Sequence, residues 1–268
     1  MKRVYIVISQ VLLLSFALFL LAPFIVIFVT SFAKRWFGTA WLPEEFSLEW
    51  YSWAWKIAEV PMVMFNSLSI SFMAVFISLI IAIPTSWTLA RRHIKHKEIW
   101  LSLFLLPRMI PPLAFALGIA KVFYTVDLID TYMGVALAHV TVCAPYCILI
   151  LTSTFEGLDH RIMDAASVCG ATPLQTFFKI TLPLTMPGIL SAMIFAFTTS
   201  YNEFTLTIMT YGPKTMTLPI KTYLAIGDGF WEVASAISII LLVPSLIILF
   251  IIQGKLKPEK LMGGFKGI

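Results

Sequence analysis

The stretch of residues 164–183 is DAASVCGATPLQTFFKITLP, and it lies in the longest polar interruption between the apolar segments of this chain. We expect the residues just before Gly170 to form a short helix with an apolar face. Glycine ends a helix readily because it adopts the left-handed conformation without steric cost. Thr172 and Pro173 predict a second helical start, since proline suits the first helical turn. We expect Leu182 and Pro183 to end this second helix, so that the stretch forms a helix-turn-helix projection.

The composition assigns the chain to a lipid bilayer. Apolar residues make up 59% of its 268 residues and charged residues only 12%, and the mean hydropathy is +0.91. One soluble core could not bury so much apolar surface. A helix needs about 20 apolar residues to cross a membrane. Six stretches reach this length, and they are residues 4–32, 62–90, 99–123, 134–154, 187–211 and 231–253. Because the runs are continuous and do not alternate, we predict an all-α membrane protein with six transmembrane helices.

The spacing of these stretches predicts three parts. Residues 1–61 form an N-terminal transmembrane helix and an outer loop, in which residues 47–58 form a short amphipathic helix. Residues 62–253 form a five-span domain, and residues 254–268 form a tail. A cleaved signal peptide is the alternative for the first helix. Its apolar run is longer than the roughly 7 to 15 residues of a signal peptide's core, and no small-residue cleavage site follows, so we expect it to be retained.

The distribution of Lys and Arg predicts the orientation. Placing both termini, the loop at 91–97 and the loop at 156–183 on one side gives that side twelve Lys and Arg residues and the other side six, with Arg108 inside a span. Basic residues favour the cytoplasmic side, so both termini are predicted to be cytoplasmic. The net charge of +5 is then explained by the membrane surface, and no nucleic acid is expected as a partner.

The spacing within residues 164–183 resembles the EAA loop of permease subunits from binding-protein-dependent ABC importers. In that loop Glu-Ala-Ala, three residues, Gly, nine residues and Ile-x-Leu-Pro follow one another, and Asp164 here replaces the Glu. The resemblance implies a type I ABC importer permease fold (MetI-like) and a multi-pass protein of the bacterial inner membrane. In the family this loop is the coupling helix that docks on the ATP-binding subunit. The residues that match it are Asp164, Ala165, Ala166, Gly170, Ile180, Leu182 and Pro183.

The same resemblance implies the partners. They are a dimer of ATP-binding subunits, a second permease subunit in a heterodimer or a second copy of this chain, an extracytoplasmic substrate-binding protein and membrane lipid. The sequence itself has no P-loop, because Gly212-Pro213-Lys214-Thr215 lacks the upstream glycine. We therefore expect no cofactor in this chain, with ATP and Mg²⁺ on the partner subunit.

Two other classes of protein fit less well. An enzyme needs clustered acids, bases or nucleophiles, and His93, His96, His139 and His160 form no such pattern, so we expect no enzymatic activity. A self-sufficient secondary transporter usually has paired repeats with ion sites near the membrane midplane, which the sequence does not suggest. Cys143 and Cys147 lie four residues apart in an apolar span without further ligands, which favours packing over metal binding.

Two charged residues fall inside the predicted spans and are candidates for the substrate pathway. Arg108 lies in the third span, where Pro107, Pro111 and Pro112 predict a broken helix. Glu203 lies in the predicted fifth span. A charge at the bilayer centre costs about 2.5 to 3.5 kcal/mol, so both should face the protein interior or a cavity. Either Glu203 pairs with Arg108 to hold the bundle together, or it faces the substrate with Tyr201 and Asn202, and Arg108 faces a polar cavity or the second subunit.

The surroundings of Glu203 suggest a substrate class. Residues 200–205, together with Thr217-Leu218-Pro219 and Tyr223, are similar to permeases of the polyamine (spermidine/putrescine) branch, which also spans importers of opines, aminophosphonates and ferric iron. An acidic residue in the path suits a cationic amine. Carbohydrate importer permeases are the alternative, because they share the coupling loop and can carry a similar Asn-Glu pair.

Overall fold

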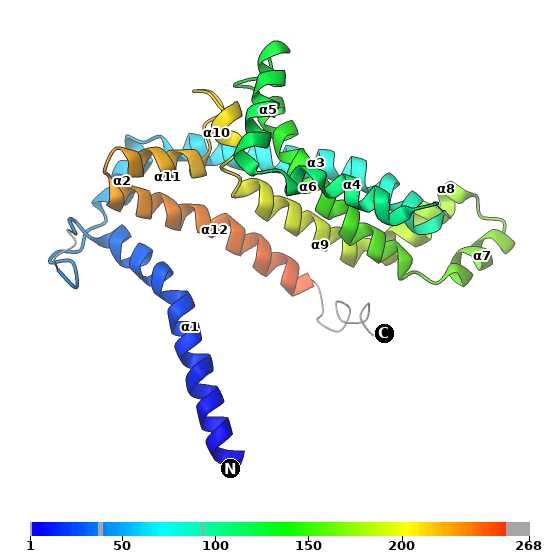
Figure 1. Ribbon diagram of the computed structural model, residues 1–268, viewed down its shortest axis with the longest axis horizontal. Helices are drawn as coiled ribbons and strands as arrows, with labels where there is room; N and C mark the ends of the chain where they lie inside the picture. Colours follow the sequence, from blue (N-terminus) through cyan, green and yellow to red (C-terminus); the bar gives the residue numbers. More distant parts are fainter. Residues whose placement is uncertain (1, 37–39, 93, 256–268) are drawn as a thin grey trace. The chain divides into compact units, whose positions relative to one another are not determined.

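A computed structural model describes residues 2–36, 40–92 and 94–255, and helices dominate them (Figure 1). Within these residues five helices are long and apolar enough to cross a membrane, or six if one bent pair counts as a single span. This confirms an all-helical membrane protein. Most of the predicted tail, including Lys257, Lys260 and Lys266, lies outside the described residues, and the predicted orientation and domain limits stay predictions.

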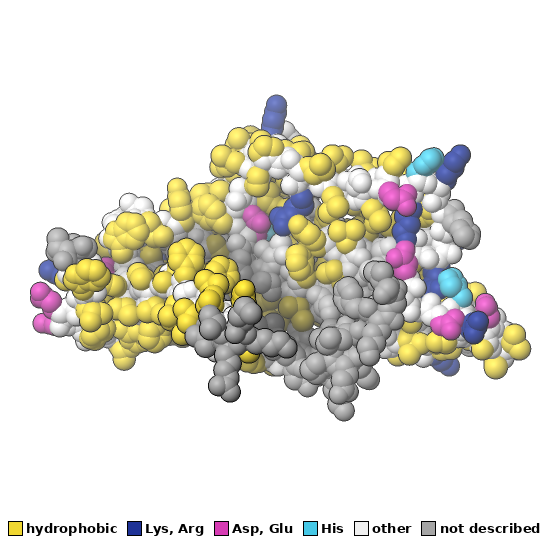
Figure 2. All heavy atoms as spheres, turned by 60° about the horizontal axis from the view of Figure 1, so that its bottom comes forward, with side chains coloured by type: hydrophobic (Ala, Val, Ile, Leu, Met, Phe, Trp, Pro, Cys, Tyr) yellow, Lys and Arg dark blue, Asp and Glu magenta, His cyan; other side chains and the backbone are white. Residues whose placement is uncertain are grey.

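Side chains that face outward are largely apolar, as a lipid environment requires. In Figure 2 hydrophobic side chains cover much of the visible face, and charged side chains gather in small groups. Helix α1 (Lys2–Phe32) shows this best, because many apolar side chains between Tyr5 and Phe28 are exposed in the isolated chain. Such a helix needs lipid or another protein as its surroundings.

The chain forms two compact units, and the first holds the residues up to Met64 together with Leu218–Val243. Helix α2 (Glu49–Lys56) confirms the short helix predicted in the outer loop. The indole nitrogen of Trp50 donates to the Ala33 carbonyl at 2.9 Å. A hydrogen bond between Lys34 and Glu45 closes the same loop and raises the pKa of Lys34. This unit also contains α11 (Leu218–Gly227) and the start of α12 (Trp231–Lys255).

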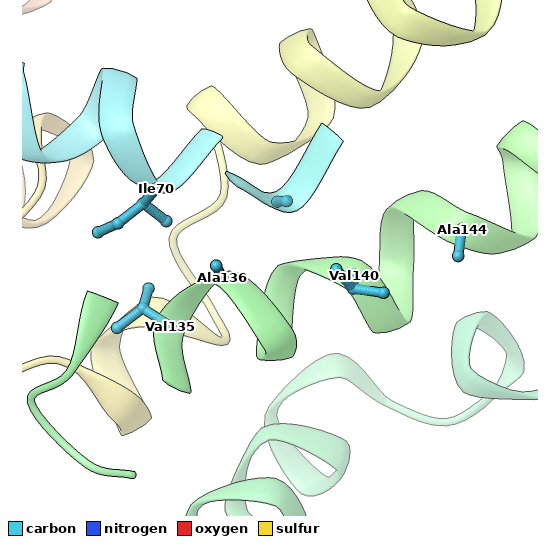
Figure 3. Close-up of a cluster of buried hydrophobic side chains, with 6 residues drawn as sticks. Ile70, Val135, Ala136, Val140 and Ala144 are labelled. Carbon is cyan, nitrogen blue, oxygen red and sulfur yellow. The ribbon is translucent and has the colours of Figure 1, made fainter. Parts of the chain in front are cut away.

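The second unit is built around α6 (Tyr132–Glu156), whose side chains are mostly buried. Ile70 and Ala74 of α3 (Val60–Arg91) pack with α6 residues in an apolar cluster (Figure 3). The α6 members of this cluster are Val135, Ala136, Val140 and Ala144. On another face of α6, the thiols of Cys143 and Cys147 contact the backbone of α9 (Leu182–Tyr201). Small residues let these helices approach closely.

The third predicted span is broken, as its prolines predict. Helix α4 (Lys97–Met109) and helix α5 (Pro112–Thr125) meet at an angle of 91°. Ile110 and Pro111 are extended at the junction, and Pro112 takes the first position of α5. Proline cannot donate the hydrogen bond that would continue α4, but it fits the first turn of a new helix.

The limits predicted for the fifth span are wrong at both ends. Helix α8 (Pro173–Thr176), a π-helical turn η1 (Phe177–Thr181) and α9 run on without a stop, so the span is Pro173–Tyr201. In the wide turn Leu182 N–H donates to the Phe177 carbonyl. Pro183 therefore falls in the first turn of the following α-helical segment, where its missing N–H is tolerated. At the other end the helix stops at Tyr201, and α10 (Thr207–Thr210) follows after a break.

Candidate coupling segment and pathway site

Helix α7 (His160–Val168) begins and ends with strong local signals. The Asp159 carboxylate accepts from the Arg161 N–H at 2.9 Å, which caps the start of the helix. Gly170 has a φ of +80° and ends it. Its N–H donates to the Ser167 carbonyl, and the Ala171 N–H donates to the Ala166 carbonyl, both at 3.0 Å. This pattern is a Schellman motif, and it confirms that Gly170 turns the chain.

A capping box starts the second half of the segment. The Thr172 hydroxyl accepts from the Gln175 N–H at 3.3 Å, and the Gln175 side chain accepts from the Thr172 N–H at 2.9 Å. Pro173 follows at the first helical position, as predicted. Only four residues, Cys169 to Thr172, therefore separate the end of α7 from the start of α8, and hydrogen bonds to the backbone fix both ends.

Contacts with α3 hold this segment and the turn before it in place. The Arg91 guanidinium donates to the Leu158 carbonyl at 3.2 Å and lies 3.0 Å from His160 Nε2. The ring of Trp87 packs edge-on against Phe177 of the π turn. Lys97 at the start of α4 pairs with Glu156 at the end of α6. The segment is thus tied directly to α3, and the Lys97–Glu156 pair ties α4 to the end of α6 just before it.

Three apolar side chains on the surface of the segment are largely exposed. Val168 is 88% exposed, Leu174 is 70% exposed and Phe178 is 58% exposed. Asp164 and Ala165 are exposed beside them, and Ala166 is buried toward the rest of the chain. Of the other matched residues, Gly170 and Pro183 are exposed and Ile180 and Leu182 are half-buried. Apolar side chains at a polar turn are typical of a surface that binds another protein.

Arg108 and Glu203, far apart in sequence, line one small cavity of about 160 Å³. Prolines of the broken span and Val142 of α6 complete much of its wall. Among the described residues no ion pair joins Arg108 to Glu203. The two charges therefore stand in the same cavity without neutralising each other directly.

Each charge has its own support. Arg108 Nε lies 3.4 Å from the Tyr146 hydroxyl, and the guanidinium carbon lies 4.9 Å from the centre of the same ring. A carboxylate oxygen of Glu203 accepts from the Leu206 N–H at 2.9 Å, so the side chain caps the turn that leads into α10. Glu203 thus lies in the break after α9 and not within a helix, which corrects the depth that a continuous helix would imply.

The two residues before Glu203 point to different surroundings. Asn202 is exposed, and its amide donates to the Thr198 carbonyl at 2.9 Å. Tyr201 is 1% exposed, and its ring stacks on Phe197. Tyr201 therefore packs in the interior beside the break, while Asn202 faces outward in the isolated chain.

Sequence reasoning missed a buried histidine at this break. His139 is 1% exposed, and its Nδ1 and Nε2 lie 2.8 Å from the hydroxyls of Ser200 and Thr207. Thr207 also donates to the Glu203 carbonyl, so its oxygen accepts from a protonated Nε2. In a neutral ring with its proton on Nε2, Nδ1 accepts from the Ser200 hydroxyl. The only signal in the sequence was a polar residue within an apolar span.

A second missed element fixes the loop after α10. The Asp130 carboxylate accepts from the N–H groups of Lys214 and Thr215 at 3.0 and 3.1 Å, and from the Thr215 hydroxyl. Asn66 donates to the carbonyls of Lys214 and Met216. In the described ranges no group of three or more His, Cys, Asp or Glu side chains could hold a metal ion.

Comparison with known proteins identifies a protein family that the chain matches and several transport proteins to which it is similar. Residues 74–260 match the family model described as "Binding-protein-dependent transport system inner membrane component". The chain is 27% identical over 230 residues to the sulfoquinovosyl glycerol transport system permease protein SmoH of Agrobacterium fabrum, covering 85% of this chain and 81% of that protein. It is 26% identical over 235 residues to the spermidine/putrescine transport system permease protein PotC of Haemophilus influenzae, covering 88% of this chain and 91% of the relative.

A solved structure shares the fold. A chain of a bacterial ABC transporter involved in the import of the acidic polysaccharide alginate superposes with a TM-score of 0.74 at 19% identity, over 96% of this chain and 98% of that one. The family match covers more than half of the sequence, including residues 164–183, Arg108 and Glu203. The chain therefore belongs to the inner-membrane components of binding-protein-dependent transport systems, as a multi-pass permease subunit of an ABC importer and not an enzyme.

Proposed function

We propose that this chain forms half of the translocation pathway for a small polar solute, and that residues 164–183 couple it to ATP hydrolysis. The observation that carries the proposal is the exposed apolar face of Val168, Leu174 and Phe178 on a segment that contacts α3 and continues into α9. A dimer of ATP-binding subunits would cover this face. Both termini would then be cytoplasmic, on the same side as the segment.

The matched residues have distinct parts in this proposal. Asp164 and Ala165 are exposed where the partner would dock, and the small side chain of Ala165 lets the partner approach closely. Gly170 sets the direction of the turn, and Ile180, Leu182 and Pro183 link the segment to α9. ATP and Mg²⁺ would bind to the partner subunit, since the sequence contains no P-loop.

The remaining partners follow from the family. An extracytoplasmic binding protein would deliver the solute, in keeping with the family description. A second permease subunit would supply the other half of the pathway, and we propose a heterodimer. The cavity lined by Arg108 and Glu203 would then face this second half, with Asn202 exposed next to Glu203 in the chain and Tyr201 packed behind the break.

For the substrate we propose a polyamine or a related amine. The Glu203 carboxylate lines the cavity without an ion-pair partner among the described residues, and it would attract a cation. The similarity to PotC supports this choice. A carbohydrate is the second candidate, favoured by the comparable similarity to SmoH.

The test begins with the binding protein that serves this importer. Its thermal unfolding would be measured with polyamines, opines, aminophosphonates and sugars, and the best ligand would then be followed in ATP-driven uptake by the reconstituted importer. Stabilisation and uptake of a cationic amine are expected. Stabilisation by a sugar alone would move the chain to the carbohydrate branch. Uptake without ATP would overturn the coupling proposal itself.

A further inference from the structure

An open groove of about 520 Å³ lies between the end of α3 and the start of α4. Its walls are mostly apolar, and the residues that line it are Pro84, Thr85, Thr88, Leu89, Ile94, Trp100 and Phe104. The groove exists because α4 packs mainly against α6. Thr85 and Thr88 donate to carbonyls of their own helix at 2.7 and 2.8 Å, so their hydroxyls demand no polar ligand.

The groove follows the last turns of α3 and the first turns of α4. From Leu89 to Pro84 it extends about 7 Å along α3, at 1.5 Å per residue. Trp100 lies near the start of α4, and tryptophan side chains concentrate at the level of lipid headgroups. An apolar groove beside such a tryptophan has the chemistry to hold the upper part of an acyl chain.

Basic residues lie in the connection between the groove residues Leu89 and Trp100. Arg92 and Lys95 are exposed in the connection between α3 and α4, and no hydrogen bond or ion pair is recorded for either side chain among the described residues. Lys97 is paired with Glu156, and Arg91 is bound to the Leu158 carbonyl, so these two are already used. Glu98 is the one acidic residue of the connection and of the first turn of α4, and Arg92 and Lys95 outnumber it.

The start of α4 adds to the attraction for an anion. His96 precedes the helix with a φ of 57° and makes no side-chain hydrogen bond to cap it. The first N–H groups of a helix carry partial positive charge and favour phosphate. An apolar slot in the membrane, two free cations and an uncapped helix start thus converge within one connection.

We propose that this groove binds one anionic phospholipid. An acyl chain lies against Leu89, Trp100 and Phe104, and the phosphate headgroup contacts Arg92 and Lys95. The charge complementarity selects an anionic headgroup over a zwitterionic one, because each basic residue near the surface attracts anionic lipid. This site is independent of the transported solute and of the coupling segment.

Native mass spectrometry of the purified permease tests the proposal. The probes are phosphatidylglycerol and phosphatidylcholine with the same acyl chains. Wild-type protein is expected to retain phosphatidylglycerol preferentially, and the double variant Arg92→Gln/Lys95→Gln should lower that retention about tenfold. The matched control is Lys56→Gln/Lys121→Gln, which removes the same charge from exposed positions far from the groove in sequence and should leave retention unchanged.

A second variant tests the apolar part of the site. Thr88→Phe fills the groove and leaves both cations in place, and it should also abolish the preference while helical content stays the same. Equal retention of both lipids by wild type, or an equal loss in the control pair, would overturn the proposal. Efficient cross-linking of Thr88→Cys to the second permease subunit in native membranes would likewise assign the groove to protein contact.

Discussion

His139 Nε2 lies 2.8 Å from the Thr207 hydroxyl. This hydrogen bond joins α6, the central helix of the second unit, to α10, the short helix that follows the end of α9. Its other nitrogen holds Ser200, in the last turn of α9. One imidazole thus spans both sides of the break that carries Glu203. The break is a fixed structure held by buried hydrogen bonds.

The substitution His139→Leu should destabilise the protein by about 2 to 4 kcal/mol, because it removes the buried hydrogen bonds of His139 with the Ser200 and Thr207 hydroxyls. Unfolding in detergent micelles would measure this. Thr141→Val is the control, since the Thr141 hydroxyl bonds only to its own helix at Ala138, and it should cost far less. Equal losses in the two variants would show that the hydrogen bonds across the break contribute little.

Replacing Gly170 should uncouple the importer. A side chain at φ +80° costs about 1 to 2 kcal/mol, so Gly170→Val should shift the turn after α7. Uptake should fall while ATP hydrolysis continues and the protein stays in the membrane. Gly157→Ala is the matched control, because Gly157 also follows a helix but has a φ of −69°. Normal uptake in Gly170→Val would contradict the role proposed for residues 164–183.

The charge of Glu203 can be separated from its capping role. Glu203→Gln keeps an oxygen that accepts from the Leu206 N–H, whereas Glu203→Ala removes both the charge and the cap. For a cationic substrate, Gln should lower uptake efficiency by roughly tenfold or more, in line with about 1.5 to 3 kcal/mol for a charged hydrogen bond. Initial uptake rates in proteoliposomes would show it. Unchanged kinetics with Gln would remove Glu203 from the pathway.

Asp130 should control the loop at residues 211–217. Asp130→Ala removes the acceptor for Lys214, Thr215 and the Thr215 hydroxyl, so the loop should loosen. A cysteine introduced at Pro213, on the exposed part of the loop, should then react several-fold faster with a water-soluble maleimide. Asp127→Ala is the control, because Asp127 also has a positive φ but is exposed outside this cluster. Equal rates in both backgrounds would show that Asp130 does not restrain the loop.

Features that depend on local chemistry were predictable from the sequence. Pro111 and Pro112 broke the third span, and Gly170 ended α7, because these residues limit the backbone wherever they stand. The end of α9 was not predictable in this way. It depends on His139, some sixty residues earlier, and on a Glu203 side chain that turns back to cap α10. The apolar run in the sequence continues past Tyr201 and Glu203, so it gives no sign that the helix ends there.

The cavity shows the same limit. The sequence placed Arg108 and Glu203 in separate spans and suggested either an ion pair or a pathway, but it could not reveal that Tyr146 supports the arginine. That contact requires α4 to lie on α6, which follows from packing across the whole unit. The π-helical turn was equally hidden, since Leu182-Pro183 usually indicates a stop.

That turn has a mechanical consequence. Because the wide turn accommodates Pro183, the helix runs from Pro173 to Tyr201 without interruption. Its two tips lie about 40 Å apart, at 1.5 Å per residue. At one tip Leu174 is exposed, and the other tip leads directly to Asn202 and Glu203. A displacement of the first tip therefore reaches the second along one continuous helix, and the π turn and Pro187 are the places where that helix can bend.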